Sequence, residues 1–128
     1  MEKLTREQAV SLHRKMWNWI ADETERTRTI INKYEYFKAM GITYSYDIPD
    51  YACYCCEYAI QQNNEEYENR CKCCPLDWGS DCDEYMCLDK KFMGYYDGLF
   101  ERWNLATSIY DIEESIELAR EIANLRER

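Results

Sequence analysis

The sequence predicts a mostly α-helical protein, with helices at both ends and an irregular segment between them. Both ends carry apolar side chains at helical spacing, and all eight cysteines fall between Cys53 and Cys87. A chain of 128 residues suits one domain. We therefore expect a single domain over residues 1–128, with N-terminal helices in 1–41, a cysteine-rich segment in 42–92 and C-terminal helices in 93–128.

Residues 1–41 are predicted to form two helices. Thr5 and Gln8 make a capping-box start. One helical face then follows at Ala9, Leu12, Met16, Trp19 and Ile20. Three threonines weaken helix propensity and predict a break or bend, namely Thr24, Thr27 and Thr29. A second stripe comprises Ile30, Ile31, Tyr34, Phe37 and Met40, and Gly41 is the predicted stop.

Residues 93–128 are predicted to return to helix. One face is formed by Tyr96, Leu99, Phe100 and Trp103. Asp111 is the expected N-cap of a last helix, whose early glutamates and late arginines suit the helix dipole. Its buried stripe is expected at Ile112, Ile116, Ala119, Ile122 and Ala123.

The middle of the chain is interrupted by Pro49, Pro75 and Gly79, with helical turns expected only over 57–62. A segment this long with little regular structure needs an extra constraint to stay folded. The cysteines can supply it, because the pattern C-x-C-C occurs twice, at 53–56 and at 71–74.

The paired cysteines predict a metal site. The N-terminus lacks a signal-peptide core, so we expect the chain in the cytosol, where thiols stay reduced and bind metal more often than they form disulfides. Two C-x2-C motifs separated by fourteen residues match a four-cysteine zinc site. The expected ligands of Zn²⁺ are Cys53, Cys56, Cys71 and Cys74.

Four more cysteines leave the metal count open, namely Cys55, Cys73, Cys82 and Cys87. Cys55 and Cys73 can be loop residues near the sulfur cage, and Cys82 and Cys87 small buried groups. A second metal, the replacement of one ligand by Cys82 or Cys87, and an iron–sulfur cluster are alternatives. A thioredoxin-like redox role is disfavoured, because the motifs lack a βαβ context.

Charge and residue content disfavour several functions. A formal net charge of −9 opposes direct binding of nucleic acid, and no apolar run is long enough to span a membrane. We expect the protein to have no catalytic activity, because His13 lacks a nearby nucleophile and no serine lies in a nucleophile motif. His13 is instead expected to pack beside Trp17. The twelve tyrosines are a surplus that suits a protein interface.

Several segments together resemble a group of small, largely uncharacterised bacteriophage proteins. They are HRKMWNWI at 13–20, C-x2-C-E-Y at 53–58, C-x2-C-P-L-x-W at 71–78, an aromatic run ending in Trp103, and AREIA at 119–123. The resemblance implies a phage accessory protein in the bacterial host cytoplasm, with the paired C-x2-C motifs as its metal site, and it implies no known reaction. Cys55 and Cys73 depart from the simple pattern.

We therefore expect a zinc-binding accessory protein, such as an anti-defence factor, that binds a host protein with a basic surface and inhibits or sequesters it. One alternative is a zinc-ribbon protein that binds nucleic acid or modulates transcription, for which Lys90, Lys91, Arg26 and Arg28 are the basic candidates. Another is a protein that captures a nucleotide signal in a tyrosine-lined pocket.

Overall fold

A computed structural model describes residues 1–62, 74–78 and 98–128 of the chain. The described residues form five α-helices: α1 (Arg6–Thr27), α2 (Lys33–Ala39), α3 (Tyr54–Gln62), α4 (Leu99–Ser108) and α5 (Ile112–Ala123). Two short 3-10 turns, η1 (Ser45–Asp47) and η2 (Asp50–Ala52), connect α2 to α3. The predicted mostly α-helical class is confirmed. Within the described ranges, no helix is both long and apolar enough to cross a bilayer.

Both ends of helix α1 are set by hydrogen bonds of nearby residues. The Thr5 side chain accepts the Gln8 N–H, and the Gln8 side chain accepts the Thr5 N–H, so the predicted capping box is confirmed. The break expected among the three threonines is the end of the helix after Thr27, where Arg28 adopts a left-handed conformation and donates its N–H to the Thr24 carbonyl.

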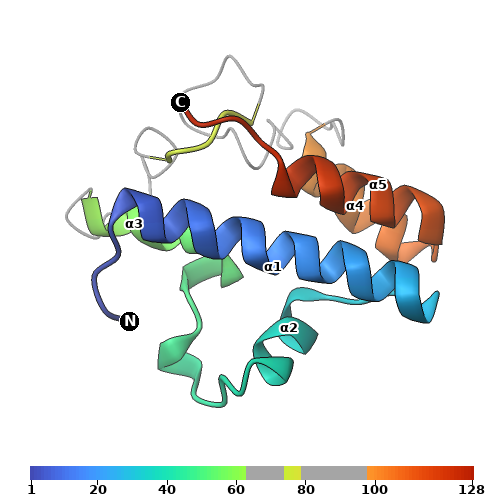
Figure 1. Ribbon diagram of the computed structural model, residues 1–128, viewed down its shortest axis with the longest axis horizontal. Coiled ribbons are helices and arrows are strands. Elements are labelled where there is room, and N and C mark those ends of the chain that lie inside the picture. Colours follow the sequence, from blue (N-terminus) through green and yellow to red (C-terminus); the bar gives the residue numbers. More distant parts are fainter. Residues whose placement is uncertain (63–73, 79–97) are drawn as a thin grey trace.

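The core lies between α1 and α5, which run antiparallel and pack more extensively than any other pair of described elements (Figure 1). The predicted Asp111 cap is confirmed, because its side chain accepts the Glu114 N–H at 3.1 Å. Buried side chains of α5 are Ile116, Leu118, Ala119, Ile122 and Ala123, so Leu118 was missed and Ile112 is only half-buried. Helix α4 covers α5, and Trp103 of α4 meets Trp17 of α1 edge to face at 4.8 Å.

Helix α2 only partly follows its predicted stripe. Tyr36 and Phe37 are buried, whereas Tyr34 and Met40 are exposed, because the short helix contacts α1 with a different face. Gly41 has a φ of 75°, which confirms the predicted stop, since glycine adopts left-handed conformations without strain.

Helix α3 begins earlier than the sequence predicts and carries the first cysteine pair. Expected only from Glu57, it starts at Tyr54, so Cys55 and Cys56 are helical rather than loop residues. The buried side chains of Tyr54, Cys55 and Ala59 belong to the common core, where α3 packs against α1 (Figure 1). This packing offsets the weak helix propensity of tyrosine and cysteine.

Candidate metal centre

Cys53 lies immediately before α3, where its sulfur caps the helix. The Sγ accepts the backbone N–H of Cys56 at 3.2 Å, and the Cys53 carbonyl accepts the N–H of Glu57 at 2.9 Å. The sulfur thus stands where serine or aspartate usually places an oxygen. Because the amino end of a helix favours negative charge, this position suits a metal-binding thiolate.

Cys74, from the second motif, lies beside the cysteines of the first. The fully buried Cys55 thiol donates to the Ala9 carbonyl, with Sγ 3.8 Å from the oxygen, and it also makes a hydrogen bond with the Cys74 side chain. The pKa of the Cys55 thiol is raised above its usual range by this hydrogen bond, by burial and by the nearby charges of Cys53 and Cys74. The two motifs therefore converge on α3.

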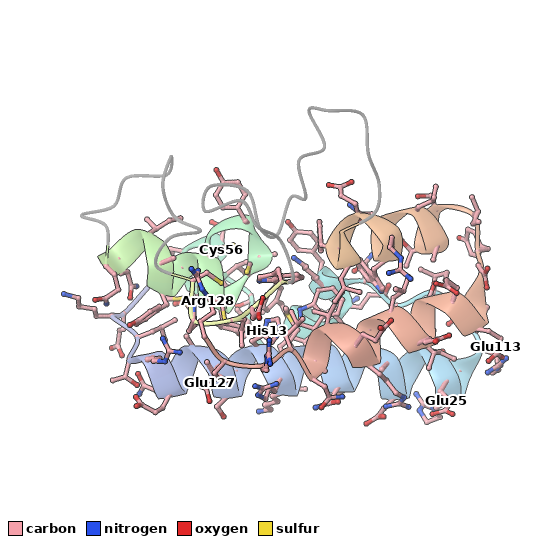
Figure 2. The ribbon with its side chains drawn as sticks, turned by 90° about the horizontal axis from the view of Figure 1, so that it is seen from above. His13, Glu25, Cys56, Glu113, Glu127 and Arg128 are labelled. Carbon is pink, nitrogen blue, oxygen red and sulfur yellow. The ribbon has the colours of Figure 1, made fainter. Side chains whose placement is uncertain are left out.

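The segment 74–78 is fixed by the last residues of the described chain. Leu76 pairs with Glu127 in an antiparallel bridge, and Asp77 N–H and Arg128 N–H donate to the carbonyls of Arg126 and Pro75 at 2.8 and 2.9 Å. Figure 2 shows Glu127 and Arg128 beside α1, at the end of the molecule that carries α3. Sequence spacing gave no signal for this pairing, because the partners are far apart in the chain.

Two side chains strengthen the same attachment. The Arg128 guanidinium donates to the Cys74 carbonyl at 3.2 Å, and Arg6 of α1 donates to the carbonyl of Pro75 at 3.3 Å and to that of Arg128 at 2.7 Å. The backbone of Cys74 is consequently held to α1 by hydrogen bonds that do not involve its sulfur.

The predicted zinc ligands are only partly described. Cys53 is half-buried, Cys56 and Cys74 are buried, and Cys71 lies outside the described residues, as do Cys73, Cys82 and Cys87. Among the residues that the structure describes, no three histidine, cysteine or acidic side chains are grouped to hold a metal ion. The zinc site therefore stays a prediction, and Cys55, which was expected in a loop, lies in α3 and contacts Cys74.

His13 is a buried structural residue. Its Nε2 lies 2.8 Å from the Ile122 carbonyl oxygen, and neighbouring Arg14 donates to the Ala123 carbonyl at 2.7 Å, so both cap the end of α5. The expected contact with Trp17 is confirmed, with ring centroids 6.5 Å apart. Burial is the main cause that lowers the pKa of His13 to about 4.

Trp78 also lies beside this histidine. It packs edge to face against the ring with centroids 6.1 Å apart, and both His13 Nδ1 and Trp78 Nε1 are buried without a hydrogen-bond partner among the described residues. Because Nε2 donates to the Ile122 carbonyl, Nδ1 is an acceptor and the indole N–H a donor.

No family model, curated protein or solved structure matches this chain.

Proposed function

We propose that the chain is a zinc-binding bacteriophage accessory protein without catalytic activity. It works in the bacterial host cytoplasm, where it binds a host protein with a basic surface and inhibits or sequesters it, as an anti-defence factor. The observation that carries the protein-binding part is a pair of tyrosines on η1. The side chains of Tyr44 and Tyr46 are 61% and 66% exposed, and their rings stack 5.3 Å apart at an interplanar angle of 15°.

An exposed tyrosine pair is suited to anchor a partner. Tyrosine is enriched among interface hot spots because its ring offers a large, rigid apolar surface and its hydroxyl a hydrogen bond. The pair lies in the segment between α2 and α3, which projects away from the α4–α5 layer (Figure 1). Exposed Asp47 adds a negative charge beside it, and the whole chain carries −9. A basic partner therefore gains both electrostatic attraction and apolar contact.

The basic side chains that could bind nucleic acid do not favour that alternative function. Arg26 is paired with Glu23, and Arg28 with Glu113, while Lys90 and Lys91 lie outside the described residues. Neutralised arginines offer little counterion release on a phosphate backbone.

The zinc ion would serve as a structural clamp. Cys53, Cys56, Cys71 and Cys74 supply four sulfur ligands, and a site closed by four thiolates leaves no open position for substrate. The sulfur-capped start of α3 and the anchored backbone of Cys74 support this assignment. Bound zinc would tie the second motif to α3 and so hold the tyrosine-bearing segment on the helical core.

Native mass spectrometry of the reduced protein, with elemental analysis, tests the metal. We expect one zinc ion per chain, lost in Cys56→Ser and kept in Cys55→Ser, its neighbour on the same helix. The reverse result would replace Cys56 by Cys55 in the ligand set. A chain purified without metal and with disulfides would refute the zinc clamp.

Affinity capture from bacterial lysate tests the partner. The tagged protein should retain a basic protein at low ionic strength and release it at high ionic strength, because exposed charges are screened by salt. The double variant Tyr44→Ala/Tyr46→Ala should lose this protein, whereas Leu105→Ala, which removes an exposed side chain of α4, should keep it. Retention that is independent of salt or unchanged in the tyrosine variant would contradict the proposal.

A further inference from the structure

A cavity of about 460 Å³ lies between the start of α2, the turn η2 and the helix α4. Its volume falls within the range of roughly 300–1,000 Å³ that is usual for small-molecule sites. The cavity is separate from the described cysteines and from the stacked pair Tyr44 and Tyr46, since none of these residues lines it.

Four aromatic side chains line the cavity: Tyr34, Tyr51, Phe100 and Trp103. Tyr34 and Tyr51 are 63% and 56% exposed, whereas Trp103 is buried in the middle of α4. Aromatic side chains of this kind bind flat rings by stacking, as they do nucleobases. The walls therefore favour a planar aromatic ligand.

Among the described residues, Lys33 is the single charged one that lines the cavity. Its Nζ lies 4.5 Å from the centroid of Phe100 and 3.4 Å from the Tyr51 carbonyl oxygen. No ion pair between described residues includes Lys33. The described lining thus contains one cation and no carboxylate, in a chain with 25 acidic residues, and this local charge favours an anionic ligand.

The part of the cavity lining that comes from α4 also offers hydrogen-bond donors and acceptors. The hydroxyls of Thr107 and Ser108 both donate to the Asn104 carbonyl, at 2.9 and 2.6 Å, so their oxygens remain as acceptors. The side-chain amide of Asn104 makes no hydrogen bond within the described part of the chain and presents one acceptor and a donor group. An asparagine amide matches the paired donor and acceptor on the edge of a nucleobase.

From the aromatic side chains, the Lys33 ammonium and the polar groups of α4, we infer that the cavity binds a nucleoside monophosphate. The base stacks among the two tyrosines of the cavity and Trp103, and the phosphate contacts the Lys33 ammonium. The Asn104 side chain forms hydrogen bonds with the edge of the base. The inference is independent of the proposed protein partner and of the zinc clamp, because it rests on other residues.

Isothermal titration calorimetry of the full chain with AMP and GMP tests the site, with adenosine and inorganic phosphate as partial ligands. We expect one mononucleotide per chain, and weaker binding of adenosine and of phosphate. Lys33→Met should weaken mononucleotide binding about tenfold or more, as expected for loss of a charge-assisted hydrogen bond, and should leave adenosine unchanged. Lys38→Met, at an exposed lysine of the same helix, should bind like the wild type.

Other results would overturn the inference. Absence of binding by both mononucleotides, or equal weakening by Lys33→Met and Lys38→Met, excludes a specific phosphate contact. Tighter binding of inorganic phosphate than of AMP excludes a role for the aromatic walls. Circular dichroism of each variant checks that its helices are retained. Asn104→Ala gives a second test at an exposed position, because it should weaken AMP binding while the Lys33 ammonium stays in place.

Discussion

Replacement of His13 by glutamine is expected to remove a pH-dependent part of the stability. His13 is fully buried, with its Nε2 2.8 Å from the Ile122 carbonyl oxygen. Burial lowers its pKa from 6.5 to about 4; the hydrogen bond with Ile122 acts in the opposite direction, and Arg14 and Lys33 lower the pKa further. The folded protein therefore holds a neutral imidazole at pH values where the unfolded chain takes up a proton.

The size of the effect follows from the two pKa values. A tenfold change in proton affinity corresponds to about 1.4 kcal/mol, so a pKa lowered from 6.5 to about 4 corresponds to about 3 kcal/mol. Because the folded-state pKa is the lower one, this stability is fully present above pH 6.5 and is lost as the pH falls through about 4. Between about pH 7 and about pH 5 the wild type should lose about 2 kcal/mol through His13 alone.

Urea unfolding of both proteins at these two pH values measures the difference. Glutamine keeps an N–H donor for the Ile122 carbonyl but has no titratable group, so the variant should lose about 2 kcal/mol less than the wild type. Contributions from carboxylates and cysteines are shared by the two proteins and cancel. His13 is also the only histidine, so its ring resonance should titrate near pH 4. Equal losses in the two proteins, or a midpoint near 6.5, would refute the reasoning.

Three further substitutions test the helical frame. Ile122→Ala removes a fully buried side chain between α5 and α1 and should cost roughly 2–5 kcal/mol in urea unfolding; a loss below 1 kcal/mol would show that this contact is not a packed core. Asp111→Ala deletes the cap that accepts the Glu114 N–H and should cost about 1 kcal/mol, measured by thermal unfolding, with Asp111→Asn restoring most of it. Arg28→Ala breaks an exposed ion pair with Glu113 and should change stability by less than about 1 kcal/mol, so a larger loss would assign this pair a structural role.

Features set by neighbours in the sequence could be predicted. The capping box of Thr5 and Gln8, the cap at Asp111 and the stop at Gly41 each depend on a few consecutive residues, and all three are present. The same holds for the helical class, because the apolar stripes at both ends of the chain repeat at the period of a helix.

Features set by distant residues could not be predicted. Helix α3 starts at Tyr54 because its side chains pack against α1, although tyrosine and cysteine give weak local signals. The bridge between Leu76 and Glu127 joins segments that no periodic pattern relates. Spacing alone also could not show that Cys55 contacts Cys74, since the residues of the second motif reach α3 through tertiary packing.

The antiparallel pairing of α1 with α5 has a consequence for synthesis on the ribosome. His13 and the Ile122 carbonyl, which meet in the core, are separated by 109 positions. The apolar face of α1 therefore leaves the exit tunnel long before the helix that covers it exists. At roughly 5–20 residues per second, that face stays open for about 5–20 seconds. Nascent α1 is thus a binding site for cellular chaperones, and the yield of folded protein should depend on them more than its small size suggests.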